Sequence, residues 1–334
     1  MTKQLAGLVV AAALLVPACK RQEQASARID PAQLAAFAPL PAAMESPENP
    51  LTEPKVDLGR TLYYDTRLSR DQDLSCNSCH DLKNYGVDGR QFSVGTKKQL
   101  GGRNGQTVYN AAAHLAQFWD GRAPTVEEQA KGPVLNPVEM GMPSGDAVIA
   151  RLRAVSAYRT AFRAAFPGQA NPINYDNVGV AIGAFERRLV TPGRWDRFLQ
   201  GDTAALTPAE KVGFNTFTAT GCQACHTGVL LGGSMYQKIG VVRPWPDKSD
   251  VGRVAITHQA SDSLVFKVPS LRNIERTAPY FHNGSVATLP EAVRLMAQHQ
   301  LGRDLTEQQV TQIVAFLNAL TGEIPASYIA PKTN

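Results

Sequence analysis

Two copies of the pattern Cys-x-x-Cys-His lie far apart in this chain of 334 residues, at residues 76–80 and 222–226. In such a pattern the two thiols can add to the vinyl groups of a haem, and the adjacent histidine can bind the haem iron. A redox dithiol or half of a zinc site is the alternative, but neither explains a histidine directly after both cysteine pairs. The sequence therefore predicts two covalently bound haem c groups, one held by Cys76, Cys79 and His80 and the other by Cys222, Cys225 and His226.

The ligand on the far side of each iron decides what that haem can do. A methionine opposite the histidine gives a six-coordinate iron of high potential that suits electron transfer, whereas an open position permits chemistry on peroxide or oxygen. Met296 follows His226 in the chain and precedes a C-terminal helical pattern, an order usual in monohaem cytochromes c. We therefore expect His226 and Met296 to bind the second iron and His80 to bind the first. Met140 and Met142, in the first half, fit a reaction pocket better than an axial position.

The N-terminus has the features of an export signal. Lys3 precedes a short apolar stretch, residues 5–16, which is too short to span a bilayer as a helix. Residues 15–19 resemble a bacterial lipoprotein signal and end at Cys19, the one cysteine outside the haem motifs. We expect residues 1–18 to be removed, Cys19 to carry a lipid anchor, and the mature chain to lie in the periplasm. An ordinary signal peptide cut nearby is the alternative.

The basic charge of the chain is small. The formal net charge is +5, and it falls to +4 when Lys3 is removed with the signal. Two haems add four propionate carboxylates, which bring the protein close to neutral, so the composition gives no indication of nucleic-acid binding. Hydrophobic residues make up 43% of the chain, enough for sizeable cores, and the length suggests two domains.

Helical patterns dominate between the motifs. Thr207 with Glu210, and Thr306 with Gln309, form capping boxes that mark helix starts. Strict alternation of apolar and polar residues is rare, and Gly and Pro are frequent in the connecting segments. We predict a mostly α fold of two cytochrome-c-like domains, each carrying one haem c, with long loops. The helical segments are residues 56–64, 147–166, 177–189, 207–217 and 310–320.

The composition divides the chain into three parts after the signal. Residues 20–50 are rich in Ala, Pro, Gln and Glu, which predicts a tether over residues 19–50. Each haem motif follows a helix and a short loop, as in an internal duplication. We therefore assign the first haem domain to residues 51–200 and the second to residues 201–334.

Several short stretches outside the haem motifs form a specific set: residues 58–60 (Leu-Gly-Arg), 65–69 (Asp-Thr-Arg-Leu-Ser), 117–122 (Gln-Phe-Trp-Asp-Gly-Arg), 128–133 (Glu-Gln-Ala-Lys-Gly-Pro), 136–140 (Asn-Pro-Val-Glu-Met), 277–284 (Thr-Ala-Pro-Tyr-Phe-His-Asn-Gly) and the segment around Met296. With both haem motifs, these stretches resemble the bacterial di-haem cytochrome c peroxidases over residues 50–325. The resemblance implies an enzyme that reduces hydrogen peroxide to water with electrons from a small periplasmic donor, a monohaem cytochrome c or a cupredoxin. The first domain would be peroxidatic and the second would transfer electrons. Dimers are common in that family, so a homodimer is one expected assembly.

The resemblance also implies roles for single residues. Glu139 matches the acid–base carboxylate that moves a proton between the two oxygens of peroxide. Gln129 matches an amide of the same pocket, and Trp119 matches a tryptophan between the two haems. His282 matches a residue near the second haem that could donate a hydrogen bond to a propionate.

A calcium site is implied as well. Asn104, Thr277 and Pro279 match positions that bind one calcium ion between the domains, the last two through backbone carbonyls. Because so few protein oxygens take part, water molecules would complete the coordination.

One position departs from the family pattern. In many of these peroxidases a histidine in a mobile loop caps the resting first haem, and that histidine falls at Thr96 here. A threonine hydroxyl is a poor ligand for ferric haem, and Lys97 or Lys98 could replace it only by losing a proton. We therefore expect the first haem to have no histidine gate.

Two other functions were compared with peroxide reduction. Di-haem enzymes that oxidise tryptophan residues of a partner protein resemble this chain in outline, but their second haem has a tyrosine where this chain has Met296. A non-catalytic di-haem electron carrier would need a sixth ligand on both irons, and the first half offers no obvious one.

Overall fold

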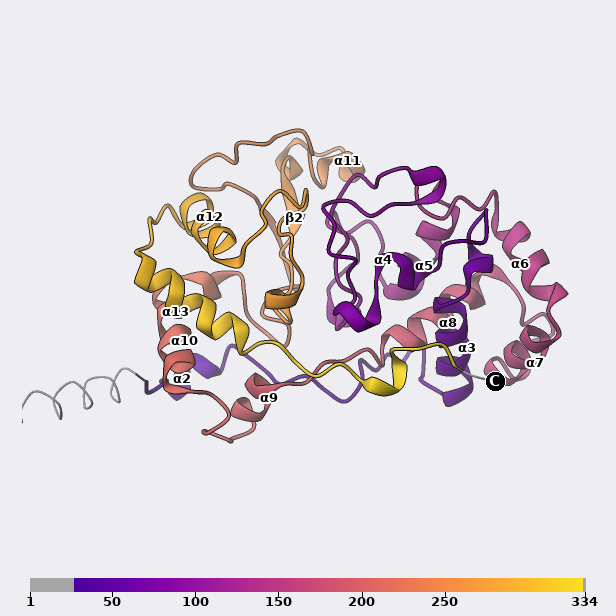
Figure 1. The fold of residues 1–334 in the computed structure, drawn as a ribbon, viewed down its shortest axis with the longest axis horizontal. Helices are drawn as coiled ribbons and strands as arrows, with labels where there is room; N and C mark the ends of the chain where they lie inside the picture. The colour runs from indigo at the N-terminus through magenta and orange to yellow at the C-terminus, as the bar shows by residue number, and fades with distance from the viewer. Residues whose placement is uncertain (1–26, 333–334) are drawn as a thin grey trace, which may run out of the picture.

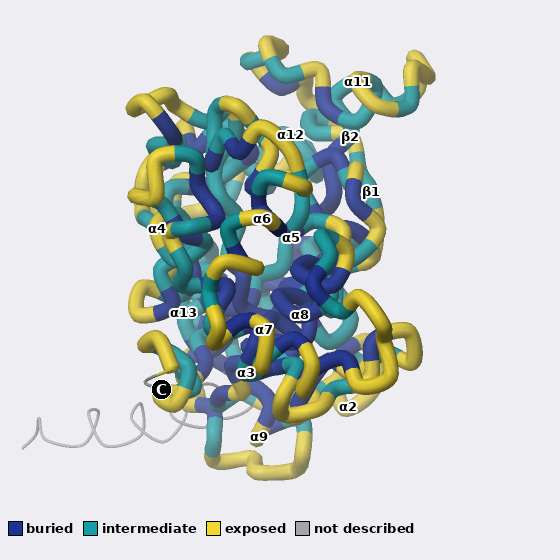
Figure 2. The backbone as a smooth tube through the Cα atoms, turned by 90° about the vertical axis from the view of Figure 1, so that its right-hand side faces the viewer, coloured by how far each residue is buried: buried dark blue, intermediate teal, exposed yellow. Residues whose placement is uncertain are grey.

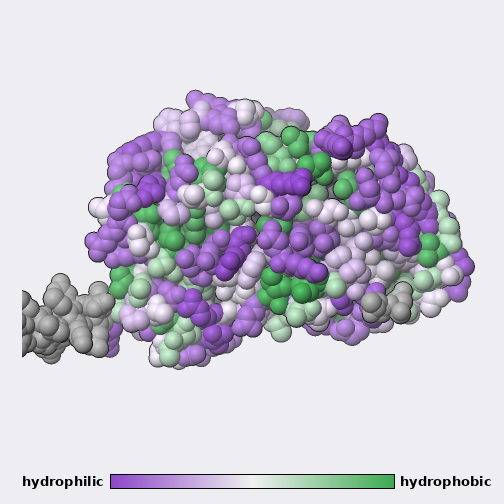
Figure 3. Space-filling view, viewed as in Figure 1, coloured by the Kyte–Doolittle hydropathy of each residue, from purple (hydrophilic) through white to green (hydrophobic). Residues whose placement is uncertain are grey.

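The computed structural model describes residues 27–332, which form two mostly helical lobes lying side by side (Figure 1). Cys19 and the predicted signal lie outside the described residues. Within the described residues, we find no helix that combines the length and the apolar character needed to cross a membrane. The face drawn in Figure 3 is predominantly polar, with separate hydrophobic patches, some of them between the lobes.

The first lobe is built around α8 (Tyr175–Glu186), which is buried along nearly its whole length (Figure 2). Gly59 belongs to α3 (Glu53–Tyr63), and a Cβ there would lie 1.8 Å from the carbonyl oxygen of Ala181, so only glycine allows α3 to approach α8 this closely. Around α8 lie α3 (Glu53–Tyr63), α5 (Val126–Leu135), α6 (Gly145–Ala154) and α7 (Ser156–Ala165), and the first haem motif forms the short α4 (Cys76–Cys79).

The second lobe has its own core. In this core α10 (Pro208–Thr220) packs against α13 (Glu307–Asn318), and a Cβ at Gly213 would lie 2.1 Å from the carbonyl oxygen of Gln312, so the two helices approach very closely. Trp195, Phe214 and Phe316 pack together beside this crossing with ring centroids 5.2 to 5.4 Å apart. The elements are α9 (Arg194–Leu199), α10 (Pro208–Thr220), α12 (Leu289–Leu301), α13 (Glu307–Asn318), and a hairpin of β1 (Tyr236–Lys238) and β2 (Val265–Lys267).

Both predicted capping boxes are present, at the starts of α10 and α13. The pattern over residues 147–166 differs from the prediction of one segment, because the extended backbone of Val155 separates α6 from α7. Its φ of −96° and ψ of 118° end the hydrogen-bonded turns of α6 before α7 begins.

The predicted tether is wrong for its second half. α2 (Pro31–Leu34) starts at an N-cap formed by Asp30, and Phe37 is buried in the second core against Trp195. The apolar side chains in this Ala- and Pro-rich segment bury surface that a free tether would leave in water. Residues 30–50 therefore run from the second lobe to the first (Figure 1).

The predicted domain boundary at residue 200 also needs correction. Trp195 and Phe198 of α9 belong to the second core, so the second lobe begins before α9. The C-terminal segment crosses back to the first lobe, where Tyr328 packs against the first core and Arg60 donates two hydrogen bonds to the carbonyl of Ala330. The N-terminal segment thus packs on the second lobe, and the C-terminal segment packs on the first lobe.

A buried carboxyl at the end of α8 leads to a prediction about stability. Burial raises the pKa of Glu186 to about 8, and the charge of Glu127 adds to this while Arg187 opposes it. The unfolded pKa is about 4.3, so between these values the folded protein holds a proton that the unfolded chain has lost, and stability falls as pH rises. The glutamine of Glu186→Gln cannot ionise, so this variant escapes the loss of stability at pH 7. The change in the free energy of unfolding that the substitution causes should therefore be more favourable at pH 7 than at pH 4, by on the order of 3 kcal/mol. Denaturant unfolding at the two pH values measures this difference.

Glu127→Gln is the matched control. Glu127 is ion-paired with Arg187 at 2.7 Å, and hydrogen bonds to Arg187 and Asn49 lower its pKa against the effect of burial. Its removal should destabilise the protein at pH 7. An effect of Glu186→Gln that is the same at both pH values would contradict the assignment of a protonated Glu186.

Candidate functional site

The second haem motif faces a cavity of about 230 Å³ that residues of both lobes line. Cys222, Cys225 and His226 form part of its wall, and Met296 of α12 lines the same cavity. Nδ1 of His226 lies 2.9 Å from the carbonyl oxygen of Leu231, so the tautomer that donates this bond leaves Nε2 free to bind a metal. Burial lowers the pKa of His226, which favours the neutral imidazole that a metal ligand requires. The residues present thus fit a haem with His and Met as axial ligands.

The first haem motif is held from two sides. The hydroxyl of Tyr63 donates a 2.6 Å hydrogen bond to the carbonyl of His80, and Nδ1 of His80 lies 3.3 Å from the carbonyl of Gly86. Burial raises the pKa of Cys76 to about 12 and that of Cys79 to about 11. A redox dithiol needs a lowered thiol pKa, so these cysteines do not suit that alternative.

A separate cavity of about 300 Å³ lies at Glu139. Asn136 donates a 3.0 Å hydrogen bond to Oε1 of Glu139 from the loop that follows α5. Burial raises the pKa of Glu139, and Arg122 and Asn136 partly oppose this rise. Burial raises the pKa of Cys79 first, and the charge of Glu139 adds a smaller rise, so this carboxyl acts electrostatically on the first haem motif.

Gln129, which we expected in the same pocket as Glu139, is not among the residues that line this cavity. It lies half-buried on α5, one turn before Pro133, and the residues that line the cavity are Phe118, Arg122, Ala123, Pro124, Glu128, Gly132, Pro133, Asn136 and Glu139. Its neighbour Glu128 lines the cavity instead.

Thr96 is buried and fully engaged with protein groups. Its N–H donates a 2.7 Å bond to the carbonyl of Glu139. Its hydroxyl accepts a 2.7 Å bond from Arg70 and donates a 3.1 Å bond to Asp71. Lys97 and Lys98 are exposed, with φ of 54° and 59°. The loop therefore holds Thr96 inside the fold and leaves both lysine side chains at the surface.

Trp119 is fixed between the two lobes. Its Nε1 donates a 2.9 Å bond to the carbonyl of Asn104, and its own carbonyl accepts a 2.8 Å bond from the N–H of Lys267 in β2. The indole lines the cavity of the second haem motif and lies edge-on to His282, with ring centroids 6.4 Å apart. His282 is buried, and its Nε2 has no hydrogen-bond partner among the described residues.

The three residues of the predicted calcium site line this cavity together. The side-chain amide of Asn104 donates to the carbonyls of Arg90 and Gln91 at 3.0 and 3.3 Å, which leaves its oxygen available. The peptide bond between Ala278 and Pro279 is cis, and Thr277 directly precedes Ala278. Within residues 27–332, no donor bonds to the carbonyl oxygen of Thr277 or of Pro279. Such oxygens are the ligands that Ca²⁺ prefers.

One pair of the site has no signal in the sequence. The ammonium group of Lys267 contacts Nδ1 of His114, and both residues line the cavity of the second haem motif. Burial lowers the pKa of Lys267 to about 7, with Asp120 opposing this shift. The two residues are far apart in the chain, so only the folded structure shows that they meet.

Comparison with known proteins assigns the family. Residues 53–204 match the sequence model of the di-haem cytochrome c peroxidases. Over 309 residues the chain is 45% identical to cytochrome c551 peroxidase of Pseudomonas aeruginosa, an alignment that covers 90% of this chain and 88% of that protein. This chain belongs to the di-haem cytochrome c peroxidase family.

Two further relatives agree with this assignment. This chain is 44% identical over 289 residues to cytochrome c551 peroxidase of Nitrosomonas europaea, an alignment that covers 85% of this chain and 84% of that protein. Among solved structures, a MauG-like protein associated with microbial copper homeostasis superposes with a TM-score of 0.75 at 32% identity, covering 87% of this chain and 95% of that chain. The predicted mostly helical fold is confirmed, and membership of a di-haem family implies two haem groups.

Proposed function

We propose that this chain reduces hydrogen peroxide to water in the Glu139 cavity, with electrons that enter at the second haem motif. The reaction consumes one peroxide, two protons and two electrons, and yields two waters. The main support is a half-buried acid of raised pKa, whose charge acts on Cys79 of the first haem motif, in a chain 45% identical to a peroxidase. The haem held by Cys76, Cys79 and His80 would supply the iron at which the O–O bond is cleaved.

Proton transfer depends on Glu139 and on the groups that position its carboxyl. Glu139, as carboxylate, takes the proton of the inner peroxide oxygen and returns it to the outer oxygen as that atom departs. Its raised pKa brings the carboxyl closer to the working pH, where an acid–base group is most effective. Asn136 holds Oε1 of Glu139 in place, and we assign Gln129 a supporting role at the edge of the pocket.

The second haem would receive electrons from outside the protein. We propose Cys222, Cys225, His226 and Met296 as its protein ligands, and Nε2 of His282 as a donor to one of its propionates. Trp119, fixed between the lobes, would carry electrons toward the first haem. A calcium ion at Asn104, Thr277 and Pro279 would hold the loops of the two lobes together around Trp119.

The cellular setting is part of the proposal. A periplasmic location follows from the predicted signal and from covalent haem attachment, which takes place outside the cytoplasm, with Cys19 as the lipid anchor. The electron donor would be a small monohaem cytochrome c or cupredoxin. A homodimer is the assembly that we propose.

Oxidation of tryptophan residues in a partner protein is the second candidate. It is supported by the likeness to a MauG-like crystal structure. The identity to that protein is 32%, against 45% to the peroxidase of Pseudomonas aeruginosa, and Met296 occupies the position where such enzymes have tyrosine. Peroxide reduction is therefore the better supported function.

The position of Thr96 predicts how the enzyme is activated. Because the Thr96 hydroxyl is bonded to Arg70 and Asp71, we expect no side chain from this loop on the first iron in the oxidised protein. The oxidised enzyme should then contain one high-spin haem and react with peroxide without prior reduction. Absorption and EPR spectra, followed by stopped-flow mixing of the oxidised protein with peroxide, measure both properties.

A designed histidine provides the comparison. Thr96→His should make the first haem low-spin and make the reaction depend on reduction of the second haem. A wild-type protein that is wholly low-spin and inert to peroxide when oxidised would show that another residue, Lys97 or Lys98 first, binds the iron.

A further inference from the structure

Arg122 lines the Glu139 cavity, and the proposed mechanism gives it no role. Among the described residues that line this cavity, it is the one basic side chain. Its guanidinium carbon lies 3.4 Å from the centre of the Phe118 ring, which also lines the cavity. This stacking fixes the plane of the guanidinium group at the cavity wall.

A closed loop, residues 117–123, holds Arg122 in place. The N–H of Gln117 donates a 2.7 Å bond to the carbonyl of Ala123, which closes the loop. At its tip Gly121 has a φ of 72°, and a Cβ there would lie 1.8 Å from the Tyr236 hydroxyl. Glycine is therefore required for the turn that brings Arg122 back toward Phe118.

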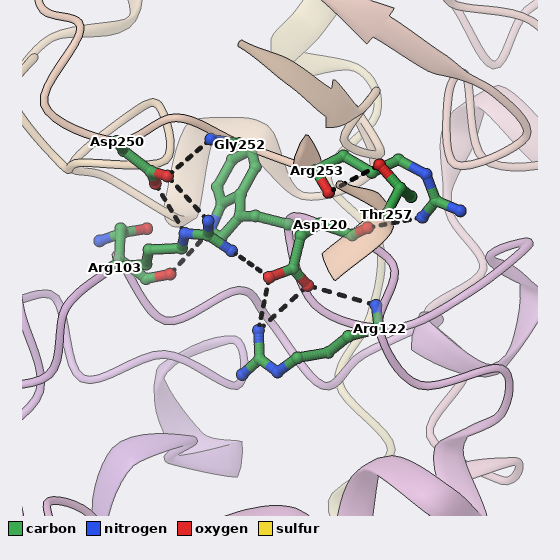
Figure 4. A network of polar contacts seen from close by, with 9 residues as sticks. Arg103, Asp120, Arg122, Asp250, Gly252, Arg253 and Thr257 are labelled. Atoms are coloured by element: carbon green, nitrogen blue, oxygen red, sulfur yellow. Dashed lines mark hydrogen bonds and ion pairs between the residues drawn. The ribbon is translucent and has the colours of Figure 1, made fainter. Parts of the chain in front are cut away.

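Asp120 is the anchor of the guanidinium. Both of its carboxylate oxygens lie 3.1 Å from Nη1 of Arg122, and one of them accepts a 2.6 Å bond from Arg103 (Figure 4). Arg103 in turn forms two bonds with Asp250 of the second lobe, at 2.6 and 2.8 Å. Figure 4 shows Asp120 between the two arginines. Asp120 thus holds both arginines, and Arg122 is the positively charged side chain that lines the cavity.

We propose that Arg122 is a catalytic residue of peroxide reduction, whose guanidinium donates a hydrogen bond to the outer oxygen of peroxide and stabilises the negative charge that develops there. This inference rests on the proposed function. When the O–O bond breaks, the electron pair goes to the outer oxygen, which leaves as water after it receives the proton carried by Glu139. The charge is largest before that proton arrives, and a fixed guanidinium stabilises it at that moment. The inner oxygen would become the second water with the two electrons that enter at the second haem motif and two protons from solvent.

The same charge acts on Glu139. Arg122 is the first of the two groups that oppose the rise of the Glu139 pKa caused by burial. The other charged group that lines the cavity is Glu128, which is exposed and paired with Lys131 at 2.9 Å. Loss of Arg122 should therefore move the acidic limb of the pH–rate profile to higher pH, because Glu139 must be ionised to accept a proton.

The test compares Arg122→Met with Arg122→Lys and a matched control, Arg253→Met. Arg253 donates a 2.7 Å bond to the carbonyl of Asp120 and stacks on Tyr236, so it supports the same loop, but it is not among the residues lining the Glu139 cavity. Fluoride, a small anion that binds open ferric haem, reports on the charge of the pocket without turnover. Titrations use the redox state in which the wild type reduces peroxide, with haem content and thermal midpoint checked for each variant.

Arg122→Met should weaken fluoride binding about tenfold and lower kcat/KM for peroxide by about ten- to a hundredfold. Arg122→Lys should lie between Arg122→Met and the wild type, and Arg253→Met should bind fluoride as the wild type does. Wild-type fluoride affinity and an unmoved pH profile in Arg122→Met would overturn the proposal, as would an equal loss in Arg253→Met. A wild type that does not reduce peroxide would contradict the proposed function itself, whereas an active wild type with an unaffected Arg122→Met contradicts only the role of Arg122.

Discussion

Glu139→Gln should lower peroxide turnover by about a hundredfold or more, with haem content unchanged. The substitution keeps the shape of the side chain and its contact with Asn136, but it removes the group that accepts and returns the proton. The rise in the Glu139 pKa comes first from burial, so an uncharged amide should be tolerated without loss of folding. Steady-state reduction of peroxide with a chemical or protein donor measures the effect.

Glu128→Gln is the control for this experiment. Glu128 lines the same cavity, but its side chain is 52% exposed and pairs with Lys131. A change there alters the charge near the pocket and leaves the proton path intact, so turnover should change by about twofold or less. Near-normal turnover in Glu139→Gln, or equal losses in both variants, would show that Glu139 does not carry the proton.

Much of the helical structure could be predicted from the sequence because its signals are local. The capping boxes at Thr207 and Thr306 bind donors three residues away, and the structure shows both of them. Helical spacing of apolar residues likewise depends on neighbours within two turns. Val155 shows the limit of such patterns, since one extended residue divides a continuous apolar stretch into α6 and α7.

The features that the sequence did not predict depend on distant contacts. Phe37 lies in a segment with the composition of a tether, yet it is buried against Trp195 and Phe214. The contact of Lys267 with His114 likewise joins residues that only the folded chain brings together. Composition describes what a segment could do in isolation, whereas burial is decided by the partner surface that it meets.

The candidate site shows the same division. Sequence motifs indicated Glu139 and Trp119 as single positions, and the structure adds what surrounds them: Asn136 on the carboxyl and Asn104 on the indole. Arg122 belongs to a matching motif, but it is the turn of the loop over residues 117–123 that places it at the Glu139 cavity. Motif spacing indicates the candidate residues, and the folded structure shows which of them line the same cavity.

Met296→His should lower the reduction potential of the second haem by roughly 100 mV or more, because a thioether ligand favours ferrous iron more than an imidazole does. Met296 lines the cavity that also contains Cys222, Cys225 and His226, so a side chain at this position of α12 shares the cavity with the residues proposed to hold the second haem. Spectroelectrochemical titration gives the potential. The near-infrared charge-transfer band of Met–Fe coordination should be lost in Met296→His and in Met296→Ala.

Met142→Leu separates ligation from packing. Met142 is buried in the core of the first lobe, so its replacement removes a methionine sulfur without touching the second haem motif. The potential and the near-infrared band should both be retained in this variant. If the band survives in Met296→Ala, another residue binds the second iron and the electron-entry role of Met296 fails. Met296→Ala should abolish the band while peroxide still reacts in a single turnover at the first haem. Electron supply would then be lost separately from the chemistry at Glu139, which shows that the second haem transfers electrons and the first haem reacts with peroxide.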